Sequence, residues 1–263
     1  MVPVPKPRDT VHSRGIEMRN LERVGRRSFF KAASVVAGVA FAGSVLPRRI
    51  AWAAALTKAE RDRMTPDEII QMMKNGNERF RSGQVSTQDY LAQQKASAKG
   101  QYPAAVLLSC IDSRAPAEMV MDLGIGDVFN ARVAGNIANE DILGSMEFAC
   151  QVAGAKVILV MGHTACGAIK GAIARVQLGN LTGLLTKIRP AVDATVYQGE
   201  RSASNYGFVD AVARKNVELT MAEIHKRSAV IAALETKGAV KIAGAMYNLE
   251  SAVVEFLAAA PKS

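Results

Sequence analysis

The sequence predicts an α/β protein with a mainly parallel central sheet flanked by helices. Short, continuous apolar runs, which are typical of strands buried on both faces of a parallel sheet, recur along the chain. The clearest of them covers residues 156–162. Segments with helical patterns separate these runs, and strands that alternate with helices indicate a parallel sheet. A length of 263 residues with 49% hydrophobic content is enough for one sizeable core.

The first expected helix begins with a strong start signal. Thr65 can cap it, Pro66 suits the first helical position, and Glu68 completes a capping box. Gly83 is a suitable end. The other expected helices cover residues 117–123, 145–153, 165–177, 209–236 and 249–259. The expected strands cover residues 104–110, 127–133, 156–162 and 240–247.

The positive charge of the chain is concentrated at its N-terminus. The whole sequence carries a formal charge of +9, with a pI near 9.6. Residues 1–53 hold ten Lys and Arg against three Asp and Glu, a net charge of +7, so residues 54–263 carry only +2. Nucleic-acid binding needs a basic surface on the folded domain. The nearly neutral body argues against nucleic acid as a partner.

The first 53 residues are expected to be a targeting leader. Arg26-Arg27-Ser28-Phe29-Phe30-Lys31 is followed by an apolar run over 32–46 and by Ala51-Trp52-Ala53, a small-x-small cleavage site. The run is shorter than the ~20 residues of a membrane span. The motif resembles the twin-arginine signal, which implies export to the periplasm by the twin-arginine machinery. An uncleaved membrane anchor and a basic arm ahead of a core helix are the alternatives.

Three of the five cysteines and histidines in residues 54–263 lie in two motifs. One is Cys110-Ile111-Asp112-Ser113-Arg114, and the other is His163-Thr164-Ala165-Cys166-Gly167. Both begin where an expected buried strand ends, and sites in open α/β sheets lie outside the carboxyl ends of the strands. Cys110, His163 and Cys166 therefore form a candidate zinc site, because catalytic zinc takes three nitrogen or sulfur ligands and keeps a fourth position open. Thiolates and imidazole disfavour Mg²⁺ and Ca²⁺.

Asp112 and Arg114 lie beside the proposed ligands. An Asp at this position can accept a hydrogen bond from water on the zinc, or it can fill the fourth ligand position itself. A bidentate Arg would keep that Asp ionised and oriented.

The two motifs together resemble those of the β-class carbonic anhydrases. Three further segments are similar to motifs of that family: 132–136 (Arg-Val-Ala-Gly-Asn), 144–149 (Gly-Ser-Met-Glu-Phe-Ala) and 75–80 (Asn-Gly-Asn-Glu-Arg-Phe). The similarity covers about residues 65–257 and is strongest over 101–175. This sequence departs from the family pattern at Val133, where an Asn is usual, and at 227–228, where Ser-Pro is common.

The resemblance implies a catalytic domain over residues 54–263 that hydrates carbon dioxide reversibly, by attack of zinc-bound hydroxide. Zinc would be held by Cys110, His163 and Cys166, with Asp112 and Arg114 as the orienting dyad. Three more residues would bind carbon dioxide or bicarbonate: Gln101, Phe129 and Gly167. Phe129 can serve the neighbouring protomer in this family, whose members are homodimers or larger oligomers.

Other interpretations of the same residues remain open. A related zinc hydrolase acting on carbonyl sulfide or carbon disulfide would have nearly the same motifs. A non-catalytic zinc-binding or redox-sensing protein would need the thiols but not the dyad. Outside the motifs, Cys150 is expected to be a core residue. His225 is expected to lie on a solvated helix face rather than to shuttle protons.

Overall fold

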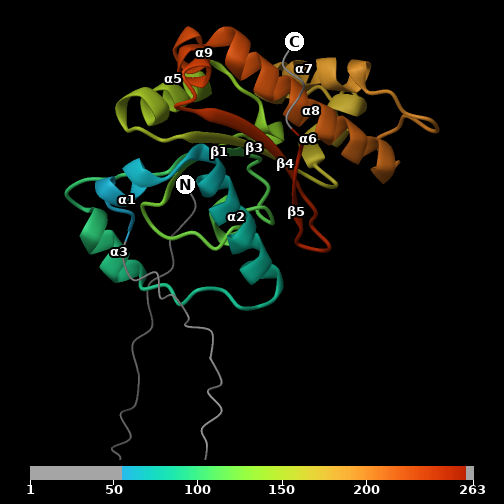
Figure 1. Ribbon diagram of the computed structural model, residues 1–263. Helices are drawn as coiled ribbons and strands as arrows, with labels where there is room; N and C mark the ends of the chain where they lie inside the picture. The colour runs from blue at the N-terminus through green and yellow to red at the C-terminus, as the bar shows by residue number, and fades with distance from the viewer. Residues whose placement is uncertain (1–54, 259–263) are drawn as a thin grey trace, which may run out of the picture. The chain divides into compact units, whose positions relative to one another are not determined.

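A computed structural model describes residues 55–258, and within them a five-stranded sheet runs in the order β2-β1-β3-β4-β5 (Figure 1). The first four strands are parallel, and β5 is antiparallel to β4. The predicted α/β fold with a mainly parallel sheet is therefore confirmed. The strands are β1 (Ala105–Ser109), β2 (Val128–Arg132), β3 (Val157–His163), β4 (Lys241–Tyr247) and β5 (Val254–Phe256).

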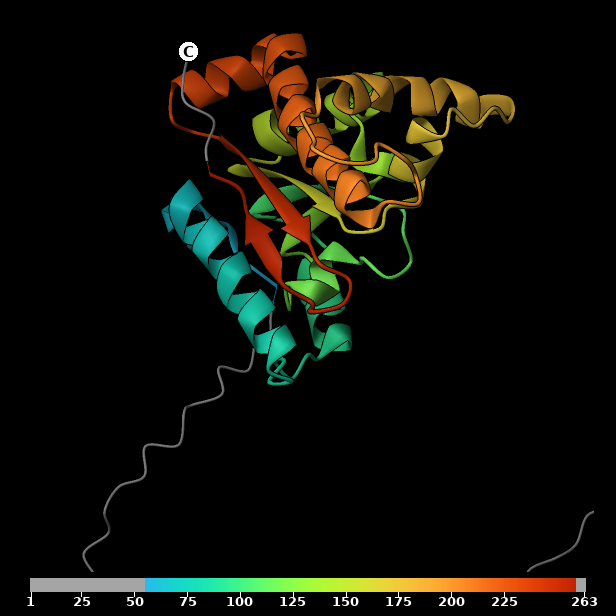
Figure 2. The same ribbon diagram turned by 90° about the vertical axis from the view of Figure 1, so that its right-hand side faces the viewer.

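Helices cover both faces of this sheet (Figures 1 and 2). Strand residues alternate between the two faces, so Val106 and Leu108 of β1 join one apolar cluster while Ala105 and Leu107 join the other. One cluster packs under α5 to α9 and the other under α2 and α4. The helices are α1 (Lys58–Arg63), α2 (Pro66–Arg81), α3 (Tyr90–Ser97), α4 (Ala117–Val120), α5 (Glu140–Glu147), α6 (Gly167–Ile173), α7 (Gly179–Ala194), α8 (Tyr206–Arg227) and α9 (Ala229–Thr236). None of them is long and apolar enough to cross a membrane.

The helix predicted over residues 249–259 is wrong as far as the structure describes it. Asn248 instead turns the chain, because its side-chain oxygen accepts hydrogen bonds from the amides of Glu250 and Ser251. Ala252 then adopts a left-handed conformation, with φ 58°. The chain returns as β5 beside β4, so the apolar residues that suggested a helix fill the edge of the sheet.

The long helix predicted over 209–236 is two helices. The chain is extended at Ser228, with φ −113° and ψ 101°, and this residue ends α8 and caps α9 through its hydroxyl. The helix predicted over 145–153 begins earlier, as α5, and continues as a π-helical turn over Phe148–Val152. The predicted start of α2 is confirmed, since Thr65 and Glu68 form a capping box.

The predicted leader lies outside the described residues. Two other predictions are confirmed within them. Cys150 is buried in the core, and burial raises the pKa of its thiol to about 12. His225 lies on an exposed part of α8, where its Nδ1 is 2.6 Å from a carboxylate oxygen of Glu235.

The motif over residues 75–80 holds α2 against the neighbouring parts of the fold. Asn77 is buried on α2, where its amide nitrogen donates to the carbonyls of Val120 and Ala252 and its oxygen accepts from the amide of Val254. These bonds tie α2 to the last residue of α4, to the turn at Ala252 and to β5, which lies alongside α2 in Figure 2. Gly76 lies against the backbone of Met121, a contact that leaves no room for a side chain.

Candidate metal centre

Two loops at the carboxyl ends of neighbouring strands bring the predicted ligands together. Cys110 directly follows β1, His163 is the last residue of β3, and Cys166 caps the N-terminus of α6. Strands β1 and β3 pair in parallel, with Ser109 opposite Met161, so their ends lie side by side. The ligand atoms of the three residues all lie within 4.8 Å of one another, and all three residues are buried.

The geometry of the three side chains fits a zinc ion. The sulfur atoms of Cys110 and Cys166 are 4.0 Å apart, whereas a disulfide needs about 2.05 Å. Two sulfurs bound tetrahedrally to one zinc at about 2.3 Å would lie roughly 3.8 Å apart. The Nδ1 atom of His163 is 2.9 Å from the carbonyl oxygen of Thr164, while its buried Nε2 has no hydrogen-bond partner. A metal ion bound at Nε2 would satisfy that atom.

The charges at the cluster favour thiolate. Hydrogen bonding by Cys166 is the main reason that the pKa of Cys110 falls to about 4, with help from His163 and the Gly135 amide. The same hydrogen bond and burial raise the pKa of Cys166. Burial lowers the pKa of His163, but the nearby Cys110, the Thr164 carbonyl and the Asp112 carboxylate outweigh it and raise that pKa overall. A metal ion would displace the remaining protons, because its ligands must be deprotonated.

Asp112 and Arg114 form the bidentate pair that the sequence predicted. The Nε and a terminal nitrogen of Arg114 lie 3.0 and 2.8 Å from the two carboxylate oxygens of Asp112. The Arg114 amide also donates to Asp112, at 3.0 Å. These bonds hold the pKa of Asp112 well below its usual range. One Asp112 oxygen lies 3.8 Å from Nε2 of His163, so the carboxylate lies at the edge of the metal cluster.

Arg132 and Gly135 support the first loop, a role that sequence reasoning missed. Arg132, at the end of β2, donates to the carbonyl of Cys110 at 3.0 Å and to that of Asp112 at 2.6 Å. The Gly135 amide donates to the sulfur of Cys110 at 3.4 Å. Gly135 has a positive φ of 68°, and a Cβ there would lie 2.5 Å from Ile188. The sequence did contain a signal for this role, because Arg132 and Gly135 both belong to the family-like motif over 132–136.

The three predicted substrate-binding residues lie in different places. Gly167, the first residue of α6, follows Cys166 and borders open space. Phe129 lies on β2, where its ring centroid is 6.1 Å from that of Phe148. Gln101 is exposed and precedes β1, so this chain carries it at the opposite end of the strand from Cys110. Of the three, only Gly167 adjoins the cluster within one chain.

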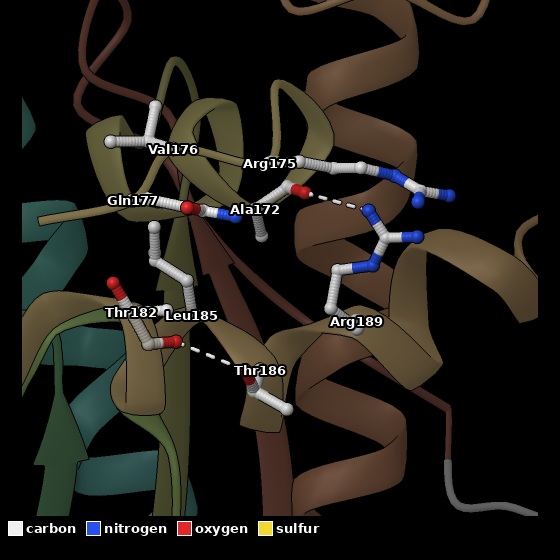
Figure 3. Close-up of a pocket in the computed structure, with 8 residues that line it drawn as sticks. All are labelled: Ala172, Arg175, Val176, Gln177, Thr182, Leu185, Thr186 and Arg189. Carbon is white, nitrogen blue, oxygen red and sulfur yellow. Dashed lines mark hydrogen bonds between the residues drawn. The ribbon is translucent and has the colours of Figure 1, made fainter.

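Two hollows on the surface are lined by residues other than the metal ligands. One, of about 220 Å³, lies between α6 and α7 and is drawn in Figure 3, where Arg189 donates to the carbonyl of Ala172 at 3.2 Å. Its lining contains none of the predicted site residues. A larger hollow of about 580 Å³ runs along β2 and α5 and is lined by Phe129, Phe148 and Glu140 among others. Phe129 is therefore a predicted site residue that lines the larger of these two hollows.

The fold and the donor set define a class of protein. A parallel α/β sheet carries two thiols and one imidazole at its carboxyl edge, and three such ligands are the number that catalytic zinc sites use. A carboxylate held by a guanidinium lies next to them. Zinc storage requires neither member of that pair, so the arrangement is that of a zinc enzyme.

Comparison with known proteins identifies the family. The family model described as carbonic anhydrase matches residues 105–254. Carbonic anhydrase 2 of Mycobacterium tuberculosis is 35% identical over 180 residues, which cover 68% of this chain and 86% of that protein. A carbonic anhydrase of Mycolicibacterium smegmatis is 34% identical over 185 residues, which cover 70% of this chain and 89% of that protein. The chain therefore belongs to the carbonic anhydrase family.

The solved structures agree with the predicted fold. The β-carbonic anhydrase CafA of Aspergillus fumigatus superposes with a TM-score of 0.58 at 24% identity, over 74% of this chain and 93% of that one. This likeness confirms the predicted β-class fold. The predicted enzyme class and zinc cofactor are also confirmed, so the chain is a zinc-dependent carbonic anhydrase whose reaction is the reversible hydration of carbon dioxide.

Proposed function

We propose that Asp112, held by Arg114, orients the water that attacks carbon dioxide. Zinc, when bound by Cys110, His163 and Cys166, supplies a Lewis acid that lowers the pKa of a water molecule from about 15.7 towards 7, as established for carbonic anhydrases with three histidine ligands. Asp112 is the acceptor at the edge of this cluster, 3.8 Å from His163. Its carboxylate accepts a hydrogen bond from the water, which directs a lone pair of the oxygen towards the substrate carbon.

Asp112 acts in this proposal as an orienting acceptor and not as the fourth zinc ligand. Both of its oxygens are engaged by Arg114, which holds the carboxylate in a fixed plane. Ligation by Asp112 would weaken this bidentate pair, because the ion would compete with Arg114 for the same carboxylate charge, whereas a hydrogen bond from water leaves the pair in place. The arrangement therefore supports an accessible centre. Gly167 follows Cys166 and a Cβ there would meet nothing within 4 Å, so in this proposal the substrate lies beside it and its backbone N–H donates to a substrate oxygen.

The observation that carries the proposal is the unpartnered Nε2 of His163, buried beside two thiols and the Asp112–Arg114 pair. The test is zinc content together with stopped-flow hydration of carbon dioxide. We expect about one zinc per chain, loss of activity on chelation and recovery when zinc is restored. Release of hydrogen sulfide from carbonyl sulfide without hydration of carbon dioxide would contradict the proposed substrate. Full zinc occupancy without either activity would favour a non-catalytic zinc protein.

We propose in addition that the enzyme is a homodimer or larger and that a partner completes its site. β2 is an edge strand, and exposed edges pair readily with other chains. Phe129 on this strand and the half-exposed Phe148 form an apolar surface beside the larger hollow. Gln101 precedes β1 and Cys110 follows it, so the two residues lie at opposite ends of the strand, and in this proposal Gln101 contributes to the partner's metal centre. A structural neighbour from Sordaria macrospora, with a TM-score of 0.54, is described as tetrameric.

The assembly is tested by light scattering on size-exclusion eluates of the wild type and of Phe129→Asp. A charge on this apolar surface is expected to shift the protein to monomers and to lower its activity. A wild-type enzyme that is monomeric and active would contradict the proposal.

We propose that residues 1–53 are a twin-arginine signal peptide that directs the enzyme to the periplasm. The support is the Arg26-Arg27 motif, the short apolar run and the concentration of positive charge. Replacing both arginines with lysine is expected to hold the protein in the cytoplasm as a full-length precursor. Fractionation and N-terminal sequencing would show this, and periplasmic delivery of the double variant would argue against this route.

A further inference from the structure

The turn that joins two of the zinc ligands has an unusual backbone conformation. His163 and Cys166 are separated by Thr164 and Ala165, and Ala165 has a φ of 55°. Residues with a Cβ rarely occupy this left-handed region, because the Cβ crowds the following carbonyl oxygen. Such a conformation persists only where surrounding structure holds it. The groups that hold Ala165 therefore help to set the directions of the two ligand side chains.

Hydrogen bonds from two separate parts of the chain hold this turn. The amide of Thr164 donates to the carbonyl of Tyr247 at 3.0 Å, and the hydroxyl of Thr164 accepts from the amide of Leu249 at 3.0 Å. Both of these partners come from the end of β4 and the loop that follows it. The amide of Ala165 donates to a carboxylate oxygen of Asp210 at 2.8 Å, and Asp210 belongs to α8. Of these three hydrogen bonds, only the one from the left-handed residue Ala165 is accepted by a carboxylate.

Asp210 is well placed for this single contact. It lies in the second turn of α8, next to Phe208 and Val209, which are fully buried and fix this part of the helix in the core. Within residues 55–258, Asp210 forms no ion pair, and the one hydrogen bond of its side chain is to the Ala165 amide. Hydrogen bonds to a carboxylate are stronger than those between neutral groups. The Asp210 carboxylate therefore stabilises the turn at Ala165 and is not part of a separate network of ion pairs.

We infer that Asp210 is a positioning residue of the zinc centre. Its carboxylate holds the Ala165 amide so that His163 and Cys166 face the same ion before the metal binds. The inference rests on zinc binding by the Cys110–His163–Cys166 cluster, and it assigns to α8 a part in the affinity and geometry of that site. Residues that orient metal ligands from behind commonly affect metal affinity without touching the ion.

The first test compares zinc affinity, measured by competition with a chromogenic chelator, across three variants. Asp210→Ala removes the acceptor and is expected to weaken zinc binding by roughly 10- to 100-fold. Asp210→Asn keeps an oxygen at the same position and is expected to retain most of the affinity. Glu223→Gln removes the same charge from an exposed site on the same helix and is expected to leave affinity unchanged. Wild-type affinity in Asp210→Ala would overturn the inference.

A second readout reports the geometry of the site independently of activity. Cobalt in place of zinc gives thiolate charge-transfer and d–d absorption bands whose intensities follow tetrahedral coordination. The bands of Asp210→Ala are expected to weaken or shift, whereas those of Glu223→Gln should match the wild type. Unchanged bands together with unchanged affinity would show that Asp210 serves only the packing of α8. Should Asp210→Ala fail to fold, Asp210→Ser is measured in its place with the same outcomes.

The third test targets the backbone strain itself. Glycine enters the left-handed region without a Cβ penalty, so adding Ala165→Gly to Asp210→Ala is expected to recover part of the lost affinity. If affinity does not recover, Asp210 does not act through the conformation of Ala165, and the inference fails. These results are separate from the test of the proposed function. A wild-type protein that binds no zinc would refute the function first, whereas this inference fails only if the wild type binds zinc and the variants behave otherwise.

Discussion

Replacement of Asp112 with Asn is expected to lower kcat/KM for carbon dioxide hydration by roughly 100- to 10,000-fold, the range for a positioned acid–base group, while the protein keeps its zinc. The amide has nearly the shape of the carboxylate but carries no charge. The amide has only one oxygen that can accept. Its NH₂ group would face one of the two Arg114 nitrogens that now donate to the carboxylate, Nε at 3.0 Å and a terminal nitrogen at 2.8 Å. The group that orients the attacking water would be lost and the metal ligands would remain.

The measurement pairs stopped-flow rates with zinc content on the same preparation. Asp193→Asn is the matched control, because it makes the same change on α7 at a largely exposed carboxylate whose contact with Arg189 is long, at 3.5 Å. We expect this control to keep wild-type activity. Loss of zinc from Asp112→Asn would instead identify Asp112 as a ligand. Activity within about threefold of the wild type, far less than an acid–base role contributes, would remove Asp112 from the mechanism.

The metal centre could be predicted from the sequence because its residues adjoin recognisable strands. Cys110 and His163 each follow or end a continuous apolar run, and parallel neighbouring strands bring such positions to one edge. The dyad was also predictable, since Asp112 and Arg114 lie close in sequence to a ligand and their pairing needs only a local turn. Local patterns were sufficient for every residue of this cluster.

Contacts between distant segments could not be predicted in this way. Asp210 is 45 residues from Ala165, and nothing in its own segment distinguishes it from an ordinary helical acid. The segment after Asn248 reads as a helix because its residues are apolar, but its conformation is decided by a side-chain turn and by pairing with β4. α7 carries an interior proline, Pro190, and no capping side chain, so the local signals of a helix were weak. In each case tertiary contacts outweighed local preference.

The motif over residues 75–80 shows how a family pattern can mark structure instead of chemistry. Gly76 is an interior residue of α2, where glycine is normally unfavourable by about 1 kcal/mol relative to alanine. A Cβ at this position would lie 1.8 Å from the carbonyl oxygen of Met121 and 2.7 Å from its carbonyl carbon. Both atoms belong to the backbone, so they cannot move aside as a flexible side chain could. The glycine is therefore required for α2 to approach the chain that follows α4.

Gly76→Ala is accordingly expected to destabilise the zinc-loaded enzyme by about 3 kcal/mol, at the upper end of the usual cost of overpacking. The helix must move away from Met121, and that movement would also loosen the buried bonds of Asn77 to Val120 and Ala252. The free energy of unfolding is measured by urea denaturation at a fixed protein concentration, because an oligomer's stability depends on it.

Gly183→Ala is the control for helix propensity, since a Cβ at Gly183, inside α7, meets nothing within 4 Å. This variant is expected to gain up to about 1 kcal/mol, the usual difference between glycine and alanine in a helix. The two substitutions are chemically identical, so opposite signs would isolate the clash at Met121 as the cause. A Gly76→Ala enzyme as stable as the wild type would show that α2 can shift freely. The contact between Gly76 and the Met121 backbone would then not explain why this motif has a glycine.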